Sequence, residues 1–196
     1  VQSCKKWKVA AMAKISPLML APPVLFTGLA ALFFIGMQRE NPNDLPSMLV
    51  NKEAPSVAAL VALADTPLLM YETLRGDGLK LVNFWGTWCV ACRAEHPTLL
   101  VIEDLLPVTL HGVNFDDTKA KAEAYLQNEG NPFTTLGEDI SDKTKIDWGV
   151  YGAPETFLID ADGKVLMRHA GPITQRVIET TLGPAIEKAL ARQPES

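Results

Sequence analysis

The sequence predicts an α/β domain, with a central mixed sheet flanked by helices, behind one N-terminal transmembrane helix. From Lys80 onward, strand and helix patterns alternate in the order strand, helix, strand, helix, strand, strand, helix. This order gives a parallel pair of strands and an antiparallel hairpin, with helices on both faces of the sheet. The transmembrane helix is predicted by residues 15–37, among which no side chain is charged.

Residues 15–37 are long enough to cross a hydrocarbon core of roughly 30 Å at about 1.5 Å per residue. Four lysines precede this run and only Arg39 closely follows it, which places the N-terminus in the cytoplasm. A cleaved signal peptide is the alternative. Either interpretation puts the folded part outside the cytoplasm. We expect a short cytoplasmic N-terminus over 1–14, the anchor over 15–37, a polar tether over 38–56 and the folded domain over 57–196.

The charge of the chain is unevenly distributed. The chain has 18 Lys and Arg and 23 Asp and Glu; all the acids follow Met37, and four lysines precede it, so residues 38–196 carry 14 − 23 = −9. Nucleic acids and anionic membrane surfaces both require clustered basic side chains. The composition therefore predicts no nucleic-acid partner.

The first elements of the domain follow from apolar runs and helix signals. A short apolar run predicts a strand over Lys80–Trp85, and a second predicts one over Val108–Phe115. Between them we expect a helix over Val90–Leu106, kinked by Pro97. An amphipathic helix is expected over Asp117–Gly130, because acids begin the segment and a glycine ends it.

The remaining elements complete the domain. Residues 142–150 predict a helical turn, and residues 155–160 and 164–170 predict two strands joined by the hairpin turn Ala-Asp-Gly-Lys. The final helix is expected over Thr174–Arg192, bent at Gly183 and Pro184. Before the first strand, residues 57–78 are partly apolar and predict a strand or a short helix.

Two of the three cysteines, Cys89 and Cys92, stand two residues apart in "WCVACRAEHP". Haem attachment requires a histidine directly after such a pair, and Arg93 occupies that position. A structural zinc site requires four ligands around the ion, and Cys89, Cys92 and His96 on one helix cannot enclose it alone. A reversible disulfide fits better, and it requires no bound cofactor.

The position of the pair predicts a role for each cysteine. Cys89 follows the strand that ends at Trp85, so we expect it at the N-terminus of the next helix, where free N–H groups and the helix dipole stabilise a thiolate. The thiolate is the form that attacks a disulfide. Cys92 lies one turn later, close enough to resolve the mixed disulfide.

"WCVACRAEHP", followed by "GVYGAPETFLIDADGKV" and "RHAG", resembles the thioredoxin-like proteins of cytochrome c maturation, the DsbE/CcmG family. The resemblance runs from about Val82 through the final helix, and the anchor matches it too. It implies a thioredoxin fold tethered to the bacterial inner membrane and facing the periplasm. It also implies a reductant that keeps the Cys-x-x-Cys-His cysteines of apocytochrome c free for haem attachment.

The resemblance also implies roles for single residues. Cys89 and Cys92 correspond to the redox pair. Pro154 in "GAPET" corresponds to the family's cis-proline, which would present the backbone of Ala153 to an incoming peptide. Val90 stands where the family commonly has proline, which leaves the redox potential and the partner open.

Two acids and one aromatic complete the predicted site. Glu95 and Glu155 resemble the family's characteristic acids, and a carboxylate near the cysteines raises their pKa by like-charge repulsion. The alternative for both acids is a solvated surface position. Trp88 is expected to pack over the disulfide.

The expected partners are apocytochrome c or its thiol carrier as substrate, and a transmembrane reductase of the DsbD/CcdA type as electron donor. The membrane itself would be contacted through the N-terminal helix. Two alternatives remain: a membrane-anchored reductant for other substrates such as oxidase assembly factors, or a copper-binding assembly chaperone that uses Cys89, Cys92 and a histidine.

Overall fold

The computed structural model describes residues 17–37, 48–76 and 78–192. These residues form two units, the helix α1 (Pro17–Met37) and a compact domain that holds every other element. None of the helices in the described residues combines the length and the apolar character that crossing a membrane requires. The anchor predicted over residues 15–37 is therefore not confirmed. Residues 1–14 and 38–47 of the predicted cytoplasmic segment and tether lie outside the described residues.

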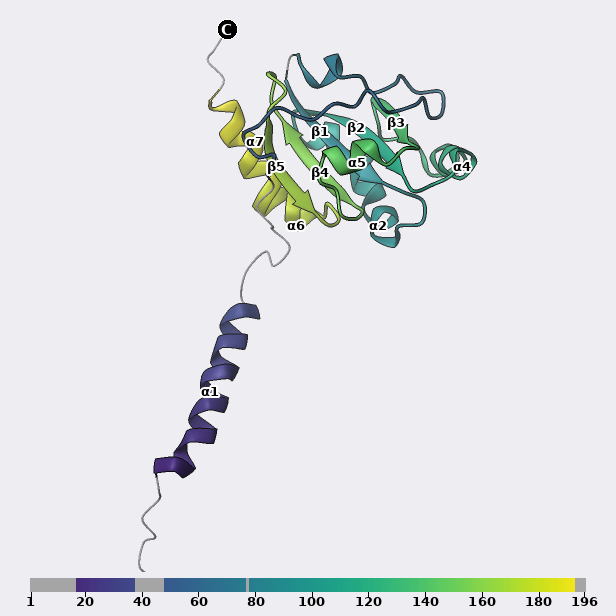
Figure 1. The fold of residues 1–196 in the computed structure, drawn as a ribbon. Helices are drawn as coiled ribbons and strands as arrows, with labels where there is room; N and C mark the ends of the chain where they lie inside the picture. The colour runs from purple at the N-terminus through teal and green to yellow at the C-terminus, as the bar shows by residue number, and fades with distance from the viewer. Residues whose placement is uncertain (1–16, 38–47, 77, 193–196) are drawn as a thin grey trace, which may run out of the picture. The chain divides into compact units, whose positions relative to one another are not determined.

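The domain is built on a five-stranded sheet with the strand order β3-β2-β1-β4-β5 (Figure 1). Strands β1, β2 and β3 are parallel to one another, while β4 is antiparallel to both β1 and β5. The predicted parallel pair, β1 and β2, and the predicted hairpin, β4 and β5, are confirmed. Strand β3 was not predicted. The bounds are β1 Leu79–Trp85, β2 Val108–Phe115, β3 Thr135–Asp139, β4 Glu155–Ile159 and β5 Val165–Ala170.

Helices follow the strands in the expected order, with α7 alongside β5 (Figure 1). The helix predicted over Val90–Leu106 is interrupted at Leu100 and Val101, so this prediction was wrong in its second half. The amide of Val101 bonds to the carbonyl of Thr98, three residues back, which closes the helix. The bounds are α2 Val90–Leu99, α3 Ile102–Leu105, α4 Lys119–Glu129, α5 Lys143–Asp147, α6 Gln175–Val177, a π-helical turn η2 Ile178–Leu182 and α7 Gly183–Leu190.

The described part of residues 57–78, which leaves out residue 77, forms neither the predicted strand nor a regular helix, apart from one 3-10 turn, η1 (Glu72–Leu74). They run along β3 and touch it at single bridges, Val61 to Glu138 and Leu68 to Leu136. Their backbone groups thus satisfy the edge of β3, which would otherwise be open to another chain. This covering role accounts for the irregular course of the segment.

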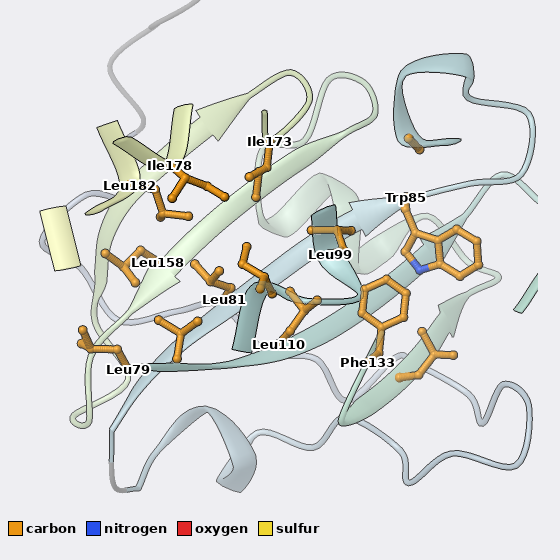
Figure 2. Packing of buried hydrophobic residues seen from close by; sticks show 14 of the residues in the cluster. Leu79, Leu81, Trp85, Leu99, Leu110, Phe133, Leu158, Ile173, Ile178 and Leu182 are labelled. Atoms are coloured by element: carbon orange, nitrogen blue, oxygen red, sulfur yellow. The ribbon is translucent and has the colours of Figure 1, made fainter. Parts of the chain in front are cut away.

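The strands alternate side chains between two apolar clusters. On one face, leucines of β1, β2 and β4 pack beneath Ile178 and Leu182, and Phe133 stacks on Trp85 with ring centroids 5.6 Å apart (Figure 2). On the other face, Phe84 and Phe157 contact Trp148. All seven residues of β1 are buried, as expected for a central strand covered on both sides. The rigid end of β1 leads directly to the two cysteines.

Candidate active site

Cys89 and Cys92 form a disulfide at the start of α2, with 5.3 Å between their Cα atoms. Cys89 is the N-cap residue of the helix, as its sequence position predicts, and its Sγ accepts a hydrogen bond of 3.0 Å from the amide of Cys92. The same amide and the positive end of the helix dipole would stabilise a thiolate on Cys89 once the disulfide is reduced. This geometry fits Cys89 as the attacking cysteine.

Exposure does not separate the two cysteines, because 5% of Cys89 and 6% of Cys92 is accessible. The residues around each cysteine do distinguish the two. Cys89 lies between Trp88 and Val90, which are 48% and 72% exposed. Cys92 instead lines a small cavity of about 10 Å³ together with the buried Glu95. Cys89 is thus adjacent to the outer surface, and Cys92 borders the interior.

Glu95 is a buried carboxyl group beneath the pair, 2% exposed, although the sequence left a surface position open. The side-chain amide of Asn83 donates to Oε1 at 3.0 Å, and the amide of Ile173 donates to Oε2 at 2.6 Å. Burial raises the pKa of Glu95 to about 7, even though the hydrogen bonds from Ile173 and Asn83 act in the opposite direction. The carboxyl group can therefore hold or release a proton near neutral pH.

The cavity beside Glu95 is close to the volume that one water molecule needs. Cys92 and Glu95 share its wall, so the carboxyl group is the titratable group of this cavity that borders the resolving cysteine. Asn83 was not predicted as a site residue, and its signal in the sequence was a neutral amide within a largely apolar strand. The wall consists of Asn83, Trp85, Gly86, Cys92, Glu95, His96, Leu99, Tyr125 and Phe133.

Glu155 is also buried, but its charge is paired. Arg168 contacts Oε2 through Nε at 2.8 Å and through Nη2 at 2.7 Å, and the amide of Tyr151 donates to Oε1 at 3.0 Å. The guanidinium also lies over the Tyr151 ring, 5.1 Å from its centroid. A carboxylate compensated in this way exerts little net charge on the cysteines, so the ion pair instead fixes the loop that precedes β4.

The peptide bond between Ala153 and Pro154 is cis, as the resemblance implies. The register of β1 and β4 pairs Phe84 with Glu155, so Pro154 lies beside the end of β1 that leads to Cys89. Ala153 packs against both apolar clusters, including the one that contains the cysteines. The loop expected to meet a peptide is thus next to the redox pair.

Trp88 was expected to pack over the disulfide. The contacts that its indole makes are with Phe115 at the end of β2. Its Nε1 donates to the carbonyl of Phe115 at 3.2 Å, and the two rings meet edge to face with centroids 5.7 Å apart. The indole also lies over Gly86, where any Cβ would clash with it. Trp88 therefore forms part of the exposed rim beside Cys89.

The described residues contain no group of three or more His, Cys, Asp or Glu side chains arranged to hold a metal ion. The two buried histidines of the domain already have hydrogen-bond partners. His96 Nε2 lies 3.1 Å from the carbonyl of Gly130, and His111 Nδ1 lies 2.9 Å from the hydroxyl of Thr135.

Comparison with known proteins agrees with this geometry. The Redoxin family profile matches residues 49–182. The chain is 44% identical over 182 residues to the thiol:disulfide interchange protein DsbE homolog of Paracoccus denitrificans, covering 93% of this chain and all of that protein. It is 41% identical to the thiol:disulfide interchange protein HelX of Rhodobacter capsulatus, covering 89% of this chain and 97% of that protein.

A solved structure supports the fold. The crystal structure of a DsbE-type thiol:disulfide interchange protein from Chlorobium tepidum aligns with a TM-score of 0.58 and 28% identity, covering 72% of this chain and 97% of that one. The identities, the length of the matches and the Cys89–Cys92 disulfide agree with one another. The chain belongs to the DsbE family of thiol:disulfide interchange proteins, within the Redoxin family, and is a thiol:disulfide oxidoreductase.

Proposed function

We propose that the protein is a periplasmic reductant of the Cys-x-x-Cys-His cysteines of apocytochrome c, or of a thiol carrier for them, during cytochrome c maturation. The direction of electron flow is inferred from Glu95, a buried carboxyl group that lines the same small cavity as Cys92. A carboxylate at this place disfavours thiolate on the pair, and a less stabilised reduced form is the better electron donor. The resemblance to the DsbE/CcmG family supports the choice of substrate.

The reaction is a two-step exchange. The Cys89 thiolate attacks one sulfur of the substrate disulfide and forms a mixed disulfide, which releases the other substrate sulfur as a thiolate. Cys92 then loses its proton to Glu95 and attacks Cys89 Sγ. This second step releases the remaining substrate thiol and leaves the Cys89–Cys92 disulfide that the structure contains. Two electrons pass to the substrate, and the oxidised protein must then be reduced again.

The proposal includes the location and the electron donor. Residues 15–37 would anchor the chain in the inner membrane, with the N-terminus cytoplasmic and the domain periplasmic. A transmembrane reductase of the DsbD/CcdA type would return the electrons to Cys89 and Cys92. Confinement to the membrane would raise the effective concentration of the protein near partners that are also held there.

Trapping of the mixed disulfide tests the substrate. The third cysteine of the chain, Cys4, is first replaced by serine so that only the pair can react. In this Cys4→Ser background, Cys92→Ser leaves Cys89 without its resolving partner, while Cys89→Ser is the matched control. We expect Cys92→Ser to accumulate a mixed disulfide with apocytochrome c or its carrier in cells, and Cys89→Ser to accumulate none. Capture of oxidase assembly factors in place of cytochrome components would contradict the proposed substrate.

The redox equilibrium of the pair tests the direction. Titration of the full chain against glutathione, again with Cys4→Ser, is expected to give a potential near the thioredoxin end of the scale, about −270 mV. A potential near about −120 mV, typical of a disulfide donor, would show that the protein oxidises its substrates and would overturn the proposal.

A further inference from the structure

The loop between β1 and α2 is held by hydrogen bonds to residues distant in the sequence. Thr87, two residues before Cys89, donates its amide to Asp117 Oδ2 at 2.6 Å and its hydroxyl to Asp117 Oδ1 at 2.9 Å. On the opposite side, Arg93 Nη1 donates to the carbonyl of Thr87 at 2.8 Å. All three polar groups of Thr87 are therefore occupied, and two of them by a single carboxylate.

Asp117 is itself fixed in place. Its Oδ1 accepts from the amide of Thr118 at 2.8 Å, just before α4, and its Oδ2 accepts from the side-chain amide of Asn114 at 3.3 Å. Partial burial acts to raise its pKa, but the hydrogen bonds from Thr87, Thr118 and Asn114 outweigh burial and lower it. Asp117 is thus ionised at neutral pH, and each oxygen accepts two hydrogen bonds.

We propose that Asp117 is a positioning residue for thiol–disulfide exchange, which acts through Thr87 to hold Cys89 at the N-cap of α2 and Trp88 at the exposed rim. The alternative is that Asp117 only fixes the turn before α4, whose N-cap residue is Thr118. That role needs only the bond from the Thr118 amide, whereas both bonds from Thr87 reach across 30 residues of sequence to the segment that carries the nucleophile. This role concerns the exchange reaction itself and holds for any substrate.

Two substitutions separate the hydrogen bonds of Asp117 from its charge. Asp117→Ala removes both. Asp117→Asn removes the charge, but its oxygen can accept from the Thr87 amide and its amide can donate to the Thr87 hydroxyl. The matched control is Asp116→Asn, which removes a neighbouring carboxylate that pairs with Lys145 at 2.7 Å. Asp116 has φ 51°, a conformation that asparagine tolerates well, so the control should fold.

The test uses the reduced full chain with Cys4→Ser and measures the rate of reaction with oxidised glutathione across pH. At a pH above the thiol pKa, Cys89 is fully ionised, so the limiting rate reports position and not charge. We expect Asp117→Ala to lower this limiting rate about tenfold and to speed hydrogen exchange at the Thr87 amide. Asp117→Asn should retain most of the rate, and Asp116→Asn should match the unsubstituted chain.

An unchanged limiting rate in Asp117→Ala would overturn the proposal. So would an equal loss in Asp117→Ala and Asp117→Asn, because the loss would then not depend on the hydrogen bonds to Thr87 that asparagine can keep. If Asp117→Ala does not fold, Thr87→Val and Thr87→Ser keep the test decisive. Thr87→Val removes the bond from the Thr87 hydroxyl to Asp117 and leaves the bond from the Thr118 amide to Asp117 intact. Thr87→Val should therefore slow the reaction, while Thr87→Ser should not. Equal rates in these two variants would count against the positioning role.

Discussion

Glu95 and Glu155 show how two buried carboxyl groups in one site differ in their electrostatic environment. Glu155 has an arginine against it, whereas both hydrogen bonds to Glu95 come from neutral amides, those of Asn83 and Ile173. Neutral donors only partly offset the cost of burying a negative charge, so the pKa of Glu95 rises to about 7. The unpaired carboxyl group is the one that lies beside Cys92.

Replacement of Glu95 by glutamine should therefore change how stability depends on pH. The folded state holds the Glu95 proton up to about pH 7, whereas the unfolded chain releases it near 4.5. The contribution to stability is full below about 4.5 and is lost as the pH rises through 7, a loss on the order of 3 kcal/mol. Glutamine cannot ionise, so Glu95→Gln should gain stability relative to the parent between about pH 5 and pH 8.

Urea unfolding of the two oxidised proteins at several pH values measures this difference. His111 shifts in the other direction, since burial and the charge of Lys80 lower its pKa to about 4, but it is present in both proteins and cancels. A constant offset is expected from the lost hydrogen bond. Parallel stability curves would show that the pKa of Glu95 is not raised in the folded protein.

Removal of Arg168 should be much more costly than removal of an exposed cation. Arg168→Met leaves Glu155 buried without its partner, and such changes cost roughly 3–5 kcal/mol of unfolding free energy. The matched control is Lys164→Met in the hairpin connection before β5, because Lys164 and Asp162 are exposed and their charged atoms are 3.9 Å apart. The control should cost less than about 1 kcal/mol. Similar losses in both variants, measured by urea unfolding, would contradict a stabilising ion pair.

The sequence predicted the residue types at the site better than their surroundings. The cysteine spacing is local, so the N-cap position of Cys89 followed from the end of the preceding strand. The burial of Glu95 depends on Asn83 and Ile173, which lie 12 and 78 residues away. Likewise, nothing near Thr87 in the sequence indicates that Asp117 would accept its hydrogen bonds. Such pairings arise from the topology and are not visible in local patterns.

At the scale of elements, the C-terminal helix contains a π-helical turn where the sequence predicted a bend. Pro184 has no N–H and its ring would clash with the carbonyl of Thr180 in a regular α-helix. The chain instead bonds the amide of Gly183 to the carbonyl of Ile178, five residues back. A Cβ at Gly183 would lie 2.8 Å from that carbonyl oxygen, so the turn requires glycine.

Gly183→Ala should therefore destabilise the domain, by about 1–2 kcal/mol, although alanine favours a regular helix by about 1 kcal/mol. In a Pro184→Ala background the helix can return to α geometry, and the same change should become neutral or stabilising. Urea unfolding of the two single variants and the double variant gives the coupling between the positions. Additive effects would contradict the link between the proline and the π turn.

The sheet shows why β3 escaped prediction while β1, β2 and the hairpin did not. Strands β1 and β2 are largely apolar runs rich in leucine, valine and aromatic residues, and the hairpin contains a turn signal, so their patterns are local. Strand β3 is five residues long, contains Gly137 and ends in two acids. It is held by pairing with β2 on one side and by single bridges to Val61 and Leu68 on the other. Its formation therefore depends on partners that its own sequence does not specify.

At the scale of the whole molecule, the described domain contains everything that the exchange reaction needs. The disulfide, Glu95, the cis-proline loop and both apolar clusters lie within residues 43–196, which form one compact unit. Every residue named above at this site belongs to that unit. The two parts of the chain should thus be separable in function, one providing chemistry and the other location.

Deletion of residues 1–37 separates these two contributions. We expect the redox equilibrium of the Cys89–Cys92 pair with glutathione to remain unchanged, because no group at the site is removed. In cells, the deleted form exported to the periplasm by a cleavable signal should support cytochrome c maturation poorly at normal expression. Overproduction should restore maturation, because a higher bulk concentration replaces the local concentration that an anchor provides.

Carbonate extraction of the full chain supplies the physical check. Release of the full chain into the soluble fraction, or full maturation by the deleted form at normal expression, would show that anchoring is not what residues 15–37 provide.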